Sequence, residues 1–311
     1  MRFTIEKIQL LKALSHAQSV VEKRHTLPVL GHVLLEADGS NLVLSTTDME
    51  LNLVENVPAV VEEPGKLTVS ATMFFDIVRK LGTDTVLLFV KDSQLHIHAG
   101  RSKFKISYLN AEDFPKLSFG DLPIYFTLKV EQLKKLFDKP RFAMATEETR
   151  YYLNGIFLHV ADDVLRAAAT DGHRLARYTL ALPEGAQGMS DVIIPRKCVG
   201  ELQKLLSEAG EGRVQIDLSP NKIRFTIGSA VLTSKLIDGT FPDYTRVIPT
   251  SNDKLLRLDP KSFAAGVDRV ATIASDKTRT GEGLMLPYPG LLPLVLRKCF
   301  HRVDKQASRA I

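Results

Sequence analysis

The chain has little cysteine. Of its 311 residues only Cys198 and Cys299 are cysteines, and neither lies in a Cys-x-x-Cys or Cys/His spacing. Without such spacings neither a zinc site nor a disulfide framework is expected, and we expect neither a metal nor another cofactor. Such cysteine usage is typical of the reducing cytoplasm.

Signals for export or membrane insertion are also lacking. The first seven residues carry charges where a signal peptide needs an apolar run. The apolar stretch at 284–296 is too short to span a bilayer, and its three prolines exclude a regular helix. We therefore expect a cytoplasmic protein that contacts no membrane.

The composition is that of a soluble globular protein, with 44% hydrophobic and 25% charged residues. A chain of 311 residues is too long for one ordinary core, which predicts two or three domains. The net charge is +5, and residues 280–311 supply +3 of it through five basic and two acidic side chains. The basic balance therefore says little about the rest of the chain.

The chain repeats itself. Gln9 and Gln132 occupy similar helical sequences, and Asp48 and Asp171 each follow an apolar strand pattern and a Thr; both pairs are 123 residues apart. Phe-Pro recurs at 114–115 and 241–242. We interpret residues 1–122 and 123–250 as two copies of one α+β unit, residues 251–279 as the start of a third, and residues 280–311 as a divergent Pro/Leu-rich basic tail.

Hydrophobic periodicity predicts the elements of the first copy. Helices are expected over 7–21 and 71–81, and strands over 33–36, 42–45, 51–57, 66–70, 86–90, 94–98 and 103–108. In the third copy a helix is expected over 264–274. His96 and His98 alternate with apolar residues and have no third ligand nearby, which predicts a solvated strand face instead of a metal site.

Residues 169–178 place several polar side chains around Gly172, between apolar strand patterns. Asp171 and His173 could form a general acid/base pair in a hydrolase. However, no Gly-x-Ser-x-Gly elbow, no nucleophilic cysteine context and no clustered carboxylates accompany them. We therefore favour a binding surface and expect no catalytic residue.

Four motifs carry a family resemblance: Thr-Leu-Pro-Val-Leu-Gly at 26–31, Arg-Tyr-Tyr-Leu-Asn-Gly at 150–155, Ala-Thr-Asp-Gly-His-Arg-Leu at 169–175 and Phe-Pro-Asp-Tyr at 241–244. With them the chain, up to about Arg279, resembles the bacterial DNA polymerase III beta subunits, the replicative sliding clamps. The resemblance implies an α+β fold of tandem DNA-clamp domains, two complete and one partial, each with two helices packed on antiparallel sheets. It also implies a homodimeric ring around duplex DNA.

The implied activity is that of a non-catalytic processivity factor, although such proteins are catalogued with DNA-directed DNA polymerase. The implied partners are double-stranded DNA of any sequence, the DNA polymerase III catalytic subunit, the clamp loader complex, and other clamp-binding polymerases and repair proteins. Residues 132–137, Gln-Leu-Lys-Lys-Leu-Phe, resemble the peptides that clamps bind, but their periodicity predicts a core helix.

The resemblance assigns three sets of site residues. DNA contacts are expected at Arg24, Arg150, Tyr151, Tyr152 and Lys197. The groove for partner peptides is expected at Leu153, Thr170, Gly172, His173, Arg174, Leu175, Pro242, Arg246 and Val247. The dimer interface is expected at Arg101, Lys103, Phe104, Ile106 and Ile273.

One alternative stays open, because strand alternation stops after Arg279. The chain could be a truncated, closure-defective clamp fragment that binds clamp partners without encircling DNA. We hypothesise a frame-disrupted or truncated C-terminus, which the coding DNA would test.

Overall fold

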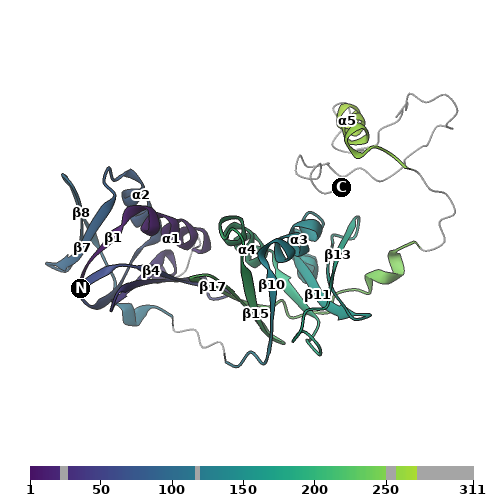
Figure 1. Cartoon of the computed structure of the whole chain (residues 1–311), viewed down its shortest axis with the longest axis horizontal. Helices are drawn as coiled ribbons and strands as arrows, with labels where there is room; N and C mark the ends of the chain where they lie inside the picture. Colours follow the sequence, from purple (N-terminus) through teal and green to yellow (C-terminus); the bar gives the residue numbers. More distant parts are fainter. Residues whose placement is uncertain (22–26, 116–119, 250–256, 272–311) are drawn as a thin grey trace. The chain divides into compact units, whose positions relative to one another are not determined.

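The computed structural model describes residues 1–21, 27–115, 120–249 and 257–271. The chain divides into two compact units, Met1–Pro242 and Asp243–Ile311 (Figure 1). The first unit contains all the helices and strands from β1 to β17, and the second contains the 3-10 helix Tyr244–Val247 and helix α5 (Pro260–Ala271).

The first repeat is built from short strands and two helices. Its elements are β1 (Arg2–Glu6), α1 (Lys7–Val20), β2 (His32–Asp38), β3 (Asn41–Thr47), β4 (Leu51–Pro58), β5 (Val60–Glu63), β6 (Gly65–Ser70), α2 (Ala71–Lys80), β7 (Thr85–Lys91), β8 (Gln94–Ala99) and β9 (Ser102–Ser107).

Over the described residues, the second repeat has the same order of helices and strands, except that it has no strand equivalent to β5. It comprises β10 (Ile124–Lys129), α3 (Val130–Arg141), β11 (Gly155–Ala161), β12 (Val164–Thr170), β13 (Leu175–Ala181), β14 (Val192–Pro195), α4 (Arg196–Glu208), β15 (Arg213–Ser219), β16 (Lys222–Ile227) and β17 (Ala230–Lys235). The α+β fold with two helices per repeat is as the resemblance implies.

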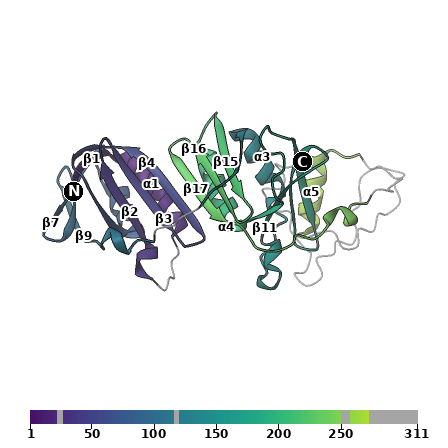
Figure 2. The same cartoon turned by 90° about the horizontal axis from the view of Figure 1, so that it is seen from below.

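Three antiparallel sheets result. Their strand orders are β5-β1-β7-β8-β9, β10-β15-β16-β17-β4-β3-β2-β6 and β13-β12-β11-β14. The eight-stranded sheet draws four strands from each repeat, and β4 pairs with β17 at its centre, with Leu51 opposite Ser234 and Glu55 opposite Ala230 (Figure 2). The two repeats therefore share one continuous hydrogen-bond ladder.

Each repeat has its own hydrophobic core beneath its helices. Phe3, Leu14 and Phe74 are fully buried in the first core. In the second core Phe137 meets Phe225 edge to face, with 6.1 Å between the ring centroids. Because Leu133, Leu136 and Phe137 are all buried, residues 132–137 form part of a core helix, as their spacing predicts.

Two features of the first repeat differ from expectation. Strand β5 was not predicted, because Val-Val-Glu-Glu has no alternation. The prediction of a solvated strand face is wrong for His96, whose side chain is buried and stacks on Phe89 at 4.9 Å. The register places His96 between Phe89 on β7 and Lys105 on β9, and these neighbours cover the ring. His98 is half-buried and meets Phe89 edge-on.

Helix α5 begins four residues earlier than predicted, at Pro260. Proline suits the first position of a helix, where its missing N–H is not needed. Asp259 Oδ1 accepts a hydrogen bond from the Ser262 N–H at 2.8 Å, which caps the helix start. Residues 272–274 of the expected helix lie outside the described residues. No helix within the described ranges is long and apolar enough to cross a membrane.

Candidate partner-binding turn and nucleic-acid face

The turn between β12 and β13 is held by two of its own side chains. Thr170 Oγ1 accepts from the Gly172 N–H at 3.1 Å and donates to the Arg174 carbonyl at 2.8 Å. Asp171 Oδ1 accepts from the N–H groups of His173 and Arg174 at 2.9 and 3.0 Å. These bonds occupy donors that a tight turn would otherwise leave without partners.

The turn between β3 and β4 in the first repeat has the same four bonds, 123 positions earlier. Thr47 Oγ1 accepts from the Met49 N–H at 3.0 Å and donates to the Leu51 carbonyl at 2.9 Å. Asp48 Oδ1 accepts from the N–H groups of Glu50 and Leu51 at 2.9 and 2.6 Å. The Thr-Asp pair is therefore scaffold common to both repeats, and the residues after it are free to differ.

The third residue of each turn has a left-handed backbone. Gly172 has φ = +87°, and Met49 at the equivalent position has φ = +78°. A Cβ at position 172 would lie 2.5 Å from Nη1 of Arg150, so a larger residue there would require that flexible guanidinium to shift. In the first repeat a methionine is held in a conformation that costs side chains about 1–2 kcal/mol.

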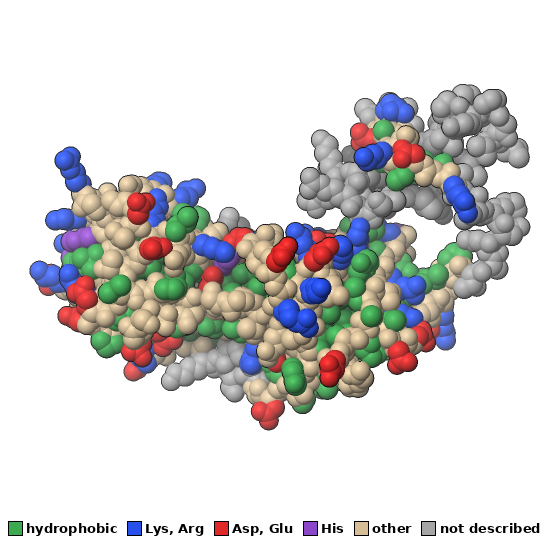
Figure 3. Space-filling view, in the orientation of Figure 1, with side chains coloured by type: hydrophobic (Ala, Val, Ile, Leu, Met, Phe, Trp, Pro, Cys, Tyr) green, Lys and Arg blue, Asp and Glu red, His purple; other side chains and the backbone are tan. Residues whose placement is uncertain are grey.

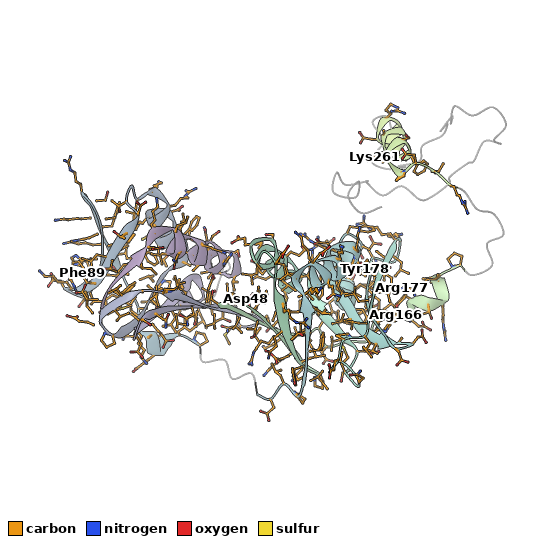
Figure 4. All side chains as sticks on the ribbon, viewed as in Figure 1. Asp48, Phe89, Arg166, Arg177, Tyr178 and Lys261 are labelled. Atoms are coloured by element: carbon orange, nitrogen blue, oxygen red, sulfur yellow. The ribbon has the colours of Figure 1, made fainter. Side chains whose placement is uncertain are left out.

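The second carboxylate oxygen of each aspartate has a different partner in the two turns. Asp171 Oδ2 pairs with Arg174 Nε at 2.9 Å, inside its own turn. Asp48 Oδ2 pairs with Lys197 of α4, so it joins the first repeat to the second. Figure 4 shows Asp48 at the junction of the two repeats. Burial alone would raise the pKa of Asp171, but the His173 and Arg174 N–H groups and the Arg174 guanidinium outweigh it and lower that pKa.

The surroundings of the turn combine apolar surface with cations. Leu153 is buried at the end of the 3-10 helix Glu148–Leu153, and Leu175 is half-buried at the start of β13. The Arg174 guanidinium lies 5.5 Å from the centroid of the Phe142 ring. Pro242 is exposed at the end of the first unit.

Two predicted groove residues belong to the second unit. Arg246 and Val247 lie on the 3-10 helix Tyr244–Val247, and both are exposed. Arg246 Nε is 3.1 Å from Asp243 Oδ2. Their assignment to the groove stays a prediction.

The predicted DNA contacts lie near the start of α4 and on the 3-10 helix Glu148–Leu153. Arg150 pairs with Glu147 at 2.7 Å. Tyr151 is 54% exposed, and its ring meets Tyr152 edge to face, with 5.8 Å between centroids. Lys197 is the second residue of α4. Arg24 lies outside the described residues.

An open depression next to these residues has mostly cations among its charged lining residues. Arg141, Arg196, Lys197 and Lys204 line it together with Glu201. Burial and the charges of Arg141 and Arg174 lower the pKa of Arg196, which is the expected result of crowding like charges. Sequence reasoning did not single out Arg141, because it stands alone at the end of α3 and only the fold brings it to Arg196.

The predicted dimer residues surround an edge strand. Among the described strands β9 pairs only with β8, so its other edge has no strand partner there. Lys103 and Phe104 are exposed on β9, and Ile106 is buried. Arg101 lies on the preceding turn, and Lys and Arg side chains gather at this end of the first repeat (Figure 3). Ile273 lies outside the described residues.

Substitutions at the third residue of the two turns should have opposite effects on the free energy of unfolding. Met49→Gly relieves the left-handed strain and should raise the free energy of unfolding by up to about 1 kcal/mol. Gly172→Ala imposes that strain and displaces Arg150, so it should lower the free energy by about 1–2 kcal/mol. Urea unfolding of the two variants measures both, and changes of the same sign would contradict the equivalence of the turns.

Comparisons with known proteins agree with this geometry. The family model of the DNA polymerase III beta subunit N-terminal domain matches residues 1–118, and that of its central domain matches residues 127–243. The beta sliding clamp of Caulobacter vibrioides is 47% identical over 304 residues, which cover 96% of this chain and 81% of that protein. The Escherichia coli clamp is 38% identical over 281 residues, covering 90% and 76%.

Solved structures show the same relationship. The sliding clamp of Bartonella birtlesii, bound to griselimycin, has a TM-score of 0.87 at 47% identity and covers 90% of this chain and 76% of that one. The Caulobacter crescentus polymerase III beta structure has a TM-score of 0.84 at 48% identity, with 88% and 76% covered. Sliding clamps are non-catalytic processivity factors, so Asp171 and His173 do not form a hydrolase site. The chain belongs to the DNA polymerase III beta subunit family, the beta sliding clamps.

Proposed function

We propose that this protein encircles duplex DNA as a ring of two copies and tethers DNA polymerase III for processive synthesis. The observation that carries the proposal is the pairing of β4 with β17, which joins two copies of one fold through a single sheet. A repeated unit joined in this way can extend around DNA. We assign residues 1–122, 123–250 and 251–279 to clamp domains one, two and the start of three.

Sliding along DNA requires contacts that carry no sequence information. Phosphates provide them, because every base pair presents the same backbone charge. The cations that line the depression are suited to this task, and Arg150 lies nearby on the 3-10 helix Glu148–Leu153. Arg141 and Arg196 supply guanidinium donors for phosphate. Contacts of this kind are weakened by salt, since binding releases counterions. Tyr151 and Tyr152 add aromatic surface beside them.

The turn at Thr170–Leu175 supports a role in binding partner peptides. Thr170 and Asp171 fix the backbone, and the residues that differ from the first repeat, His173 and Arg174, bring an imidazole and a guanidinium into the same turn as the half-buried Leu175. An apolar anchor from a peptide would supply most of the affinity. The partners we propose are the polymerase III catalytic subunit, the clamp loader complex, and other clamp-binding polymerases and repair proteins.

The outer edge of β9 is the surface that we propose for closing the dimer. An edge strand presents backbone donors and acceptors in a row, ready to pair with another chain. Phe104, 39% exposed, adds apolar area at this edge. We further propose that the protein acts in the cytoplasm, in line with its cysteine usage.

Retention on DNA tests encirclement directly. After loading by a clamp loader, the protein should stay on closed circular DNA and slide off linear DNA of the same sequence. Linearising the circle with a nuclease should release the bound protein. Equal retention on both forms would show ordinary binding and contradict the proposal. Sedimentation near 34.5 kDa, without dimer, would instead favour the closure-defective fragment.

The two turns provide a matched pair of variants for peptide binding. His173→Ala should weaken binding of a fluorescent peptide containing Gln-Leu-Lys-Lys-Leu-Phe by roughly tenfold, or about 1.4 kcal/mol. Glu50→Ala, at the equivalent position of the first repeat, should leave the affinity unchanged. Fluorescence anisotropy measures both. Equal losses in the two variants would argue against the assignment of the groove to the second turn.

A further inference from the structure

A buried histidine lies between acidic groups from the two repeats. His16 is on α1 and is only 5% exposed. Its Nδ1 is 2.9 Å from Glu55 Oε2 on β4, in the same repeat. Its Nε2 is 3.2 Å from Glu208 Oε2 at the end of α4, in the second repeat. One imidazole therefore contacts carboxylates on both sides of the junction.

Other polar contacts surround this ring at the junction. Lys12 Nζ lies 3.4 Å from Glu208 Oε2, and Ser19 donates to Glu201 of α4. The remaining elements packed against α1 contribute little charge near the ring. Strand β3 has no charged residue. On α2, Asp76 and Arg79 pair with each other at 3.0 Å, and Lys80 is exposed at the end of the helix. On β1, Arg2 pairs with Glu62 and Glu6 accepts from Gln9.

The two carboxylates favour a protonated ring. A neutral imidazole has one N–H, so if Nδ1 donates to Glu55, Nε2 turns a lone pair toward the Glu208 oxygen. An imidazolium has a proton on each nitrogen and meets both acids favourably. His16 Nε2 lies within ion-pair distance of Glu208 Oε2, but the geometry of this contact is not that of a hydrogen bond. Burial alone would lower the pKa of His16, but Glu55 and Glu208 outweigh it and raise that pKa above its ordinary 6.5.

This arrangement is not part of the scaffold that the repeats share. At the shift of 123 residues, His16 corresponds to Lys139 and Glu55 corresponds to Tyr178. The second repeat therefore has neither the imidazole nor its carboxylate at these positions. Among the described residues, the imidazole and its carboxylate partner therefore belong to the first repeat and not to the equivalent positions of the second.

We propose that His16 is a proton-dependent clasp between the two repeats, closed while the ring is an imidazolium and weakened when the ring loses its proton. The proposal goes beyond encirclement of DNA and partner binding, because it concerns the stiffness of the joint inside one chain.

The pKa shifts of His16 and Glu208 determine how the stability of the protein should change with pH. A histidine with a raised folded-state pKa adds stability that is fully present below its unfolded value of 6.5 and is lost as the pH rises through the folded value. Glu208, whose pKa is lowered by His16 and Lys12 against the opposing effect of burial, adds stability that is lost in acid. The joint should therefore be tightest in mildly acidic solution and loosen at alkaline pH.

Titration of the full-length protein followed by NMR tests the proposal. The His16 ring, assigned by its absence in His16→Gln, should titrate with a midpoint above 6.5. Thermal unfolding of the wild type should lose about 2–4 °C more than His16→Gln between pH 6 and pH 9. His98→Gln, on β8 away from the junction, should leave the midpoint of the His16 titration unchanged. A midpoint at or below 6.5, or the same pH profile in His16→Gln, would overturn the clasp.

A second variant covers failure of His16→Gln to fold. Glu208→Gln keeps the Glu55 contact and removes the negative charge from the second repeat. It should lower the midpoint of the remaining His16 titration and flatten the alkaline loss of stability. An unchanged midpoint in this variant would show that the ring does not sense the second repeat, and would equally overturn the proposal.

Discussion

The pairing of β4 with β17 is the interaction on which the rest of the structure depends. The pairing joins four strands from each repeat into one sheet of eight. Apolar side chains also pack across the junction. Val20, Leu51 and Leu53 come from the first repeat but pack in the core of the second. Separating the repeats would break the hydrogen bonds between β4 and β17 and would expose apolar side chains of the second core to water. The junction therefore resists opening. Encirclement of DNA requires a joint of this kind.

Ion pairs beside the β4–β17 ladder also connect the two repeats. Asp48 reaches Lys197 on α4, and Lys235 Nζ lies 2.9 Å from Glu50 Oε1 at the end of β17. The same turn in the second repeat keeps its hydrogen bonds but turns its aspartate toward Arg174. One scaffold is therefore used in two ways: in the first repeat its aspartate joins the two repeats, and in the second its aspartate pairs within its own turn, at the surface that we propose for partner peptides. The two turns differ at the three positions that follow the shared Thr-Asp pair.

The sequence predicted the regular part of this fold well, because alternation and helical spacing are local signals. Both helices of the first repeat and nearly all its strands were found within a few residues. Strand β5 and the burial of His96 escaped prediction, since each depends on a neighbouring strand that sequence does not place. The His16 cluster escaped for the same reason, because its partner Glu55 is 39 residues away. The polar character of the turn at Thr170–Leu175 is evident from the sequence, but only the matching hydrogen bonds show which of its residues are shared with the first repeat.

The most direct test of the account is the length of DNA made in one polymerase binding event. Polymerase III and clamp loader would extend a primed circular template with excess trap DNA, so that a dissociated polymerase cannot return. The account predicts that adding this protein lengthens the products many-fold, and that the effect disappears on linear templates from which a ring can slide. Products of unchanged length, with the protein demonstrably bound to the circle, would contradict it.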